Sequence, residues 1–289
     1  MKLGTNLPDD ASVMVDGKLN LEKATELVAK AGIRGCLTNL PGDESEWKAH
    51  TQRLKKALDA AGLELFEYNL PFFLTAPLGG NHEVEADRMV RAFEMAEEVG
   101  CLNVGTCLAN RNSIYPDMKS RSPEYYDNVR ATCELIARKA ERKGLKARFA
   151  VELVYTTVTY SLPVLLRLLD EVASPNVQGH IDIANCYTFD TLYRQREFIQ
   201  ETFAVFQEGR FHSAHLKDIL PLESYFPGLY EVLVGDGILD IRTYLECLNE
   251  MPGDVPVIIE HMHTMEEISR SHERTLALAR EAGLKFTNL

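Results

Sequence analysis

The sequence lacks paired cysteines, and this absence bears on metal binding and on disulfides. No C-x-x-C pair occurs, which argues against a zinc ribbon. With no export signal expected, the cysteines are interpreted as reduced and mostly buried thiols. The six cysteines are scattered along the chain at Cys36, Cys101, Cys107, Cys133, Cys186 and Cys247.

Long apolar runs and excess positive charge are also missing. The opening segment, MKLGTNLPDD, lacks the apolar core of a signal peptide, and no stretch approaches the ~20 apolar residues of a membrane span. Acidic residues outnumber basic ones by 43 to 31, giving a net charge of −12 at pH 7. That charge repels phosphate backbones and anionic lipid surfaces. We therefore expect a soluble cytoplasmic protein that binds neither nucleic acid nor membrane.

No linker or low-complexity tract divides the chain; instead, short apolar runs alternate with longer amphipathic segments. Each repeat would hold a strand, a helix and two loops, and the pattern occurs eight times. The predicted strands begin near Lys2, Ile33, Leu63, Cys101, Arg148, Val177, Phe211 and Val255.

Helix signals fill the segments between these strands. Apolar residues follow one face from Leu21 to Ala31, and Ser122-Pro123 predicts a helix start with proline at its first position. Thr264 with Glu267 predicts a capping box before the last helix. Glycines that suit left-handed helix ends precede four of the strands, at Gly32, Gly62, Gly100 and Gly144.

Eight βα units allow either an open doubly wound sheet or a closed barrel. A dinucleotide-binding open sheet should show G-x-G-x-x-G after an early strand, and that motif is absent. We therefore predict an α/β fold, a single (β/α)8 TIM barrel over residues 1–289. Its active site is expected at the C-terminal ends of the strands.

Charged groups end the last four predicted strands. Glu152 ends the fifth, Asp182 the sixth, His215 the seventh and Glu260 the eighth. Isolated charges within apolar runs are costly unless they are paired or bind a metal, and clustered carboxylates repel one another. A divalent cation resolves this conflict. Three oxygen ligands with one imidazole suit Mn²⁺, Mg²⁺, Co²⁺ or Fe²⁺.

These motifs resemble the xylose isomerase-like TIM-barrel superfamily, also described as sugar phosphate isomerases/epimerases. The likeness rests on V-E-L, H-I-D-I-A-N, H-L-K-D, G-D-G-I-L-D and I-I-E-H between residues 150 and 262. It implies that Glu152, Asp182, His215 and Glu260 hold one divalent metal ion, with Mn²⁺ expected and Zn²⁺ among the alternatives. It also implies that Glu152 and Glu260 form the catalytic acid/base pair, and that Asn185 and Lys217 contact the substrate.

The chemistry of this set predicts a sugar isomerase or epimerase acting on a keto-sugar or related polyol ketone. Metal polarisation of a ketone and its neighbouring hydroxyl stabilises an enediolate, while the paired glutamates move the proton. The alternative is a dehydratase of the keto-inositol or dehydroshikimate type, since the same enediolate can lose a β-hydroxyl. A non-catalytic barrel subunit is a further alternative, against which the intact ligand set argues.

Other residues complete the predicted site. Glu67 at the end of the third strand and His263 after the eighth are candidates for substrate binding. His180 is predicted to be a buried histidine one layer deeper than Asp182, and His261 is predicted to point away from the site if its strand continues. A homo-oligomer is a further expectation. Residues 224–230 are interpreted either as an apolar wall over the sugar or as a subunit contact.

Two functional details are disfavoured. A multinuclear zinc nuclease of the endonuclease IV type would need histidines on the second to fourth strands, and none lies in 33–40, 63–70 or 101–108. A phosphate site near the last two loops would meet Asp236 and the Glu266–Glu267 pair, which repel anions. A neutral carbohydrate is therefore the expected small-molecule partner.

Overall fold

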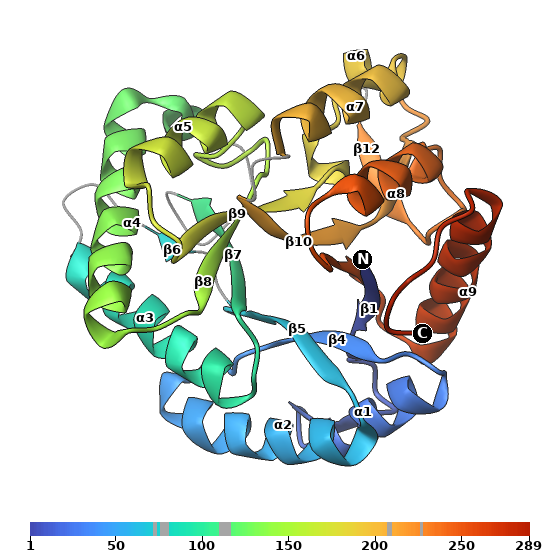
Figure 1. Ribbon diagram of the computed structural model, residues 1–289, viewed down its shortest axis with the longest axis horizontal. Coiled ribbons are helices and arrows are strands. Elements are labelled where there is room, and N and C mark those ends of the chain that lie inside the picture. The colour runs from blue at the N-terminus through green and yellow to red at the C-terminus, as the bar shows by residue number, and fades with distance from the viewer. Residues whose placement is uncertain (72–73, 76–80, 110–116, 207–209, 226–227) are drawn as a thin grey trace.

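The computed structural model describes residues 1–71, 74–75, 81–109, 117–206, 210–225 and 228–289. Within them, eight parallel strands form a nearly closed barrel surrounded by helices (Figure 1). The barrel strands are β1 (Lys2–Asn6), β4 (Gly35–Asn39), β5 (Glu64–Asn69), β7 (Asn103–Ala109), β8 (Arg148–Glu152), β9 (Val177–Asp182), β10 (Phe211–Leu216) and β13 (Pro256–Ile259). Every predicted strand is present, and the (β/α)8 prediction is confirmed.

The strands follow one another around the barrel in the order β5-β4-β1-β13-β10-β9-β8-β7. The short strand β6 (Leu74–Thr75) continues the sheet beyond β7. Two hydrogen bonds bridge the remaining gap between β5 and β7: Leu70 N donates to Gly105 O at 3.1 Å, and Asn103 Nδ2 donates to Phe66 O at 3.0 Å. The carboxyl ends of all eight strands therefore meet around one opening.

Nine helices occur among the described residues, and most lie between successive barrel strands around the sheet. They are α1 (Leu21–Lys30), α2 (Trp47–Ala61), α3 (His82–Glu98), α4 (Pro123–Lys143), α5 (Leu162–Val172), α6 (Phe189–Leu192), α7 (Gln195–Phe206), α8 (Ile241–Glu250) and α9 (Met265–Glu281). None is long and apolar enough to cross a membrane. Short 3₁₀ turns lie at Glu44–Glu46, Met118–Arg121 and Ala184–Cys186.

Two antiparallel hairpins stand apart from the barrel sheet. One joins β2 (Met14–Val15) to β3 (Lys18–Leu19), after β1, and the other joins β11 (Asp218–Pro221) to β12 (Leu229–Val232), after β10. Both follow barrel strands at their carboxyl ends and so lie on the side where a barrel carries its site.

The predicted helix boundaries follow from local chemistry. The Ser122 hydroxyl accepts a hydrogen bond from Tyr125 N, with Pro123 at the first helical position. Thr264 and Glu267 form the predicted capping box. The glycines predicted at helix ends take positive φ values between 66° and 82°, a region that costs glycine little.

Glycines inside the barrel make room for aromatic rings. A Cβ atom on Gly35 would lie 2.0 Å from Phe66, and one on Gly179 would lie 2.1 Å from Phe211. The pairing of β4 with β5 is irregular at this level, where Cys36 pairs with Leu65 but Leu37 pairs with Glu67. This bulge leaves Phe66 without a partner residue and changes which side chains enter the barrel.

His212, which lies at the opposite end of the barrel from the predicted site, supports a pH prediction. Burial, with a smaller effect of Arg148, lowers the pKa of His212 to about 4 from 6.5. Below pH 6.5, His212 is therefore protonated in the unfolded chain while it stays neutral in the folded chain. The free energy of unfolding falls as the pH is lowered towards 4. We expect His212→Asn to lose less thermal stability than the wild type between pH 7 and 4.5. A constant difference in melting temperature across this range would contradict the prediction.

Candidate metal and catalytic site

Four side chains from neighbouring strands converge at the carboxyl end of the barrel. Glu152 ends β8, Asp182 ends β9, His215 is the penultimate residue of β10, and Glu260 follows β13. Asp182 pairs directly with His215 in the strand register, and Glu260 N lies 3.4 Å from Leu216 O. One potential ligand atom from each residue lies within 4.8 Å of all the others. The structure thus brings together the four residues that were predicted to cluster because they end neighbouring strands.

The four residues differ in their access to solvent. Asp182 and His215 are completely or almost completely buried, whereas the side chains of Glu152 and Glu260 keep 15% and 12% of their surface exposed. Glu260 also lines a cavity of about 900 Å³ at the mouth of the barrel. Of the four, the two glutamates are therefore better placed to reach a bound molecule.

Lys217 lies among these acidic groups. Its Nζ is 2.8 Å from Asp182 Oδ2 and 2.8 Å from Glu260 Oε2. The three carboxylates carry three negative charges and Lys217 supplies one positive charge. With a neutral His215, two negative charges are left, which a single divalent cation would balance. Lys217 thus reduces the repulsion without removing it.

The charges of this cluster shift its pKa values in opposite directions. Burial raises the pKa of Glu152; Lys217 opposes this increase, and Glu260 adds to it. Burial would also raise the pKa of Glu260, but His215 and Lys217 hold it well below its usual range. Burial would lower the pKa of His215, yet Glu260 and Glu67 raise it well above 6.5. In the absence of a metal, His215 and Glu152 are therefore protonated more readily than Glu260.

The donor set fits a divalent metal. His215 Nδ1 lies 2.9 Å from Glu260 Oε2, and neither buried atom forms a properly oriented hydrogen bond with the described residues. His215 Nδ1 is also 3.9 Å from Asp182 Oδ2 and 4.0 Å from Glu152 Oε1. Glu260 Oε2 has an ion pair with Lys217, whereas an unsatisfied buried nitrogen such as His215 Nδ1 is costly, and an ion would satisfy it together with the nearby carboxylates.

Asn185 and Cys107 hold the glutamate on β8. Asn185 Nδ2 donates to Glu152 Oε1 at 2.7 Å and to Asp182 Oδ2 at 2.9 Å. Cys107 Sγ donates to the other Glu152 oxygen at 3.2 Å. Asn185 was predicted at the site as a substrate contact; Cys107 was not predicted there. Its position on β7, two residues after Gly105 and on the same inward face, is the signal that could have identified it.

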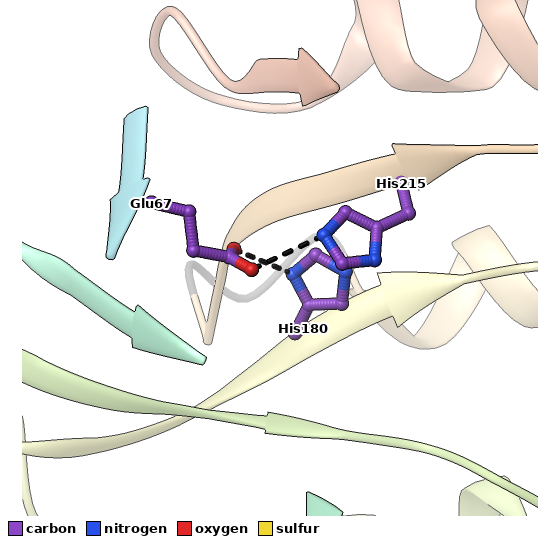
Figure 2. Close-up of side chains that lie close together, drawn as sticks. All are labelled: Glu67, His180 and His215. Atoms are coloured by element: carbon purple, nitrogen blue, oxygen red, sulfur yellow. Dashed lines mark hydrogen bonds and ion pairs between the residues drawn. The ribbon is translucent and has the colours of Figure 1, made fainter. Parts of the chain in front are cut away.

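Glu67 points toward His180 and His215 (Figure 2), and it is not among the residues that line the cavity. Its side chain is 1% exposed, and its two carboxylate oxygens face the rings of His180 and His215. Substrate contact by Glu67 stays a prediction; in the structure its carboxylate faces two imidazoles in the barrel interior, and Oε1 is hydrogen-bonded to His215. His180 is 1% exposed, which confirms its prediction as a buried histidine.

Most residues that line the cavity were not predicted as site residues from the sequence. The carboxyl ends of β1 and β4, the following loops and the start of α2 provide most of its wall. Asn6 and Asn39 each end a strand, so the rule that identified Glu152 and Asp182 applied to them too. Polar lining residues include Asn6, Lys18, Thr38, Asn39, His50 and Arg53.

The two histidines after β13 both line this cavity. His263 is mostly exposed and pairs with Asp9, at 2.8 Å. The prediction that His261 points away from the site is wrong: β13 ends at Ile259, and His261 takes a φ of 63°. This turn brings its Nε2 to 3.5 Å from Glu260 Oε2, while its Nδ1 contacts Glu231 at 2.8 Å.

The acidic residue of H-L-K-D has a structural position. Asp218 accepts hydrogen bonds from the backbone N–H groups of Ile219, Gly235, Gly237 and Leu239 at 2.9 to 3.1 Å. A Cβ atom on Gly237 would lie 2.0 Å from Asp218 Oδ1, so the second glycine of G-D-G is required for this contact. The motif thus fixes the loop beside Lys217.

Comparisons with known proteins agree with this geometry. The family model described as xylose isomerase-like TIM barrel matches residues 25–282. No curated protein sequence matches the chain. A D-psicose 3-epimerase determined in the presence of D-fructose is similar in structure, with 14% identity, a TM-score of 0.69 and coverage of 98% of this chain and 99% of that one.

Two further solved structures are similar over nearly their whole length. The IOLI protein with a bound zinc atom has 15% identity, a TM-score of 0.71 and coverage of 98% of both chains. The probable 3-DHS dehydratase AsbF from Bacillus anthracis has 17% identity, a TM-score of 0.66 and coverage of 96% of this chain and 99% of that one. At these identities the similarity establishes the fold and leaves the reaction open.

Proposed function

Because the chain belongs to the xylose isomerase-like TIM barrel family, we propose that it is a divalent-metal-dependent sugar isomerase or epimerase. Its proposed substrate is a keto-sugar or a related polyol ketone. The observation that carries this proposal is the convergence of Glu152, Asp182, His215 and Glu260 within 4.8 Å, with the two glutamates partly exposed. A Lewis acid and two carboxylates placed in this way can carry out proton transfer next to a carbonyl.

The four residues would hold one divalent ion, and Mn²⁺ is the proposed ion. The donor set of three oxygens and one nitrogen suits Mn²⁺, Mg²⁺, Co²⁺ or Fe²⁺, and Zn²⁺ stays an alternative because the similar IOLI protein binds a zinc atom. When bound, the ion would polarise the ketone and its neighbouring hydroxyl. Asp182 and His215, both buried, would serve only to hold it.

The protein's own side chains would carry the proton transfer. One of the glutamates would remove the proton next to the carbonyl, and the other, protonated beforehand, would deliver its own proton to the opposite face or to the adjacent carbon. The first result is epimerisation and the second is aldose–ketose isomerisation. Asn185 orients Glu152 through its amide, and Lys217 keeps positive charge beside Glu260. Both also remain proposed substrate contacts.

The cavity supports a polar, uncharged substrate. Asn6, Thr38 and Asn39 line it together with Glu260. Its cationic residues are already paired, since Lys18 contacts Glu46 at 2.7 Å and Arg53 contacts Glu22 at 3.0 Å. Such pairs leave little net attraction for a phosphate. His263, at the cavity edge, is a proposed contact for a hydroxyl.

Dehydration is the second candidate function. The observation that favours it is the structural similarity to a probable 3-DHS dehydratase over 96% of this chain. The first proton transfer is the same in both reactions, since loss of a β-hydroxyl follows formation of the same enediolate. The product therefore distinguishes the two functions.

Solvent exchange would test the proposed function. We expect metal-loaded protein in D₂O to introduce deuterium next to the carbonyl of at least one member of a panel of keto-sugars and cyclic polyol ketones, as followed by NMR. A new stereoisomer or aldose would identify an isomerase or epimerase, whereas an unsaturated ketone would identify a dehydratase. Protein stripped with a chelator, and verified by elemental analysis, is the control. Exchange that survives metal removal would contradict metal dependence.

A further inference from the structure

A buried carboxylate, Glu67, lies between two imidazole rings in the barrel interior. His215 Nε2 is 3.1 Å from Glu67 Oε1, with hydrogen-bond geometry. His180 Nδ1 is 3.2 Å from Glu67 Oε2 and 2.7 Å from Ser213 Oγ. The rings of His180 and His215 meet edge to face at 3.9 Å between centroids (Figure 2). All three side chains of this Glu67 group are at least 98% buried.

The backbone is shaped to admit this carboxylate. The bulge at Phe66 lets Glu67 enter the barrel one residue after the Phe66 ring has done so. On β7, Gly105 provides the space, since a Cβ atom there would lie 2.5 Å from Glu67 Oε1. Any larger residue at position 105 would push the carboxylate away from His215. The bulge at Phe66 and the glycine at position 105 thus both make room for the contact between Glu67 and His215.

We propose that Glu67 is a positioning residue for the metal centre. By accepting a hydrogen bond from Nε2–H of His215, Glu67 fixes the orientation of the ring and leaves Nδ1 as its free nitrogen. That nitrogen faces Glu260, Asp182 and Glu152 at 2.9 to 4.0 Å. Partners of this kind orient a metal-binding histidine and increase its basicity. The inference rests on the proposed metal-dependent function.

His180 supports Glu67 from the other side. Its Nδ1 shares a hydrogen bond with Ser213, which lies two residues before His215 on the inward face of β10. The arrangement therefore connects β5, β9 and β10 below the proposed ion. The same three residues could instead bind a second ion directly, because their ligand atoms also lie within 4.8 Å of one another. The hydrogen bond from His215 Nε2 to Glu67 favours the positioning role.

The test compares Zn²⁺ affinity among wild type, Glu67→Gln and Glu67→Ala by competition titration of the full-length protein. We expect Glu67→Ala to lose about 10–100-fold in affinity, the usual cost of removing such a partner. Glu67→Gln keeps an oxygen acceptor and the shape, so its loss should be smaller. Glu97→Gln is the matched control, because it removes the same charge from a carboxylate that binds the backbone N–H of Ala147, at 2.8 Å.

Nitrogen-15 NMR of the Zn²⁺-loaded proteins gives a readout that activity does not. In the wild type we expect His215 to bind the ion through Nδ1 and to carry a slowly exchanging proton on Nε2, a signal that Glu67→Ala should lose. Melting curves of all variants would separate this effect from misfolding, and the Glu67→Gln result holds if the alanine variant fails to fold.

Three results would overturn the proposal. Unchanged affinity in both Glu67 variants, with wild-type binding intact, would reject the positioning role alone. Two Zn²⁺ ions per chain, with the second lost in Glu67→Gln, would assign Glu67 as a ligand. A wild-type protein that binds no divalent metal would reject the proposed function and, with it, the role of Glu67.

Discussion

Replacement of His215 with alanine should remove bound metal and activity together. His215 is the only nitrogen donor of the four-residue set, and its Nδ1 lies within 4.0 Å of all three carboxylates. Removing a partner that merely orients a ligand costs about 10–100-fold, so loss of the ligand itself should exceed about 100-fold in metal affinity. Elemental analysis after gel filtration and the deuterium-exchange assay would measure both effects on the same preparation.

Two other histidines provide controls for this change. His212 lies near Lys2 and Arg148 at the other end of the barrel, and His180 lies deeper than the ligand set. His212→Ala should bind metal as the wild type does, and His180→Ala should retain its ion with a smaller loss of affinity. If His180→Ala loses the ion while His215→Ala keeps it, the roles given to the two buried histidines are reversed.

The strand ends were predictable because burying charge is costly. A carboxylate within an apolar run, such as Asp182 in G-H-I-D-I, requires a partner, and parallel strands place such groups at one end of the sheet. Eight repeats then place Glu152, Asp182, His215 and Glu260 on consecutive strands. The glycines at helix ends were predictable for an equally local reason. The residue that follows a helix often takes a left-handed backbone conformation, which glycine adopts at little cost.

Predictions from strand position reach less far where the strand is irregular. Glu67 was predicted to bind substrate because it lies at the end of the third strand, and this stays a prediction; in the structure the bulge at Phe66 directs its carboxylate to His180 and His215. His261 was predicted to point outward, but the chain leaves the strand at Ile259 and turns. Bulges and turns depend on packing between strands, which no single segment of sequence contains.

The ion pairs that balance charge in the site could be found only in the folded structure. Lys217 was predicted as a substrate contact from its motif, and the ion pairs it forms with Asp182 and Glu260 could not be read from spacing. Two residues after His215 it has the same inward parity, but its long side chain could reach several partners. The cavity wall formed by the loops after β1 and β4 was missed because the cost of burial identifies charged strand ends more sharply than amide ones.

Glu152→Gln and Glu260→Gln should each lower activity by ~10²–10⁴-fold or more, because a general acid or base usually contributes that much. The amide keeps the shape of the side chain and one oxygen that can coordinate, but it cannot accept or deliver the proton. Metal affinity should therefore fall less than in His215→Ala. Steady-state rates and metal titrations on the two variants, measured beside Glu97→Gln, would separate proton transfer from metal binding.

The deuterium-exchange assay then assigns the two glutamates their separate roles. If the missing group only returns the proton, the variant should still exchange the hydrogen next to the carbonyl with D₂O while failing to form the stereoisomer. If the missing group removes the proton, exchange and turnover should be lost together. The different environments of Glu152, held by Asn185 and Cys107, and Glu260, beside Lys217 and the cavity, favour such a division. Full turnover by both variants would mean that the glutamates only hold the metal, and Lys217 would be the next candidate for the proton transfer.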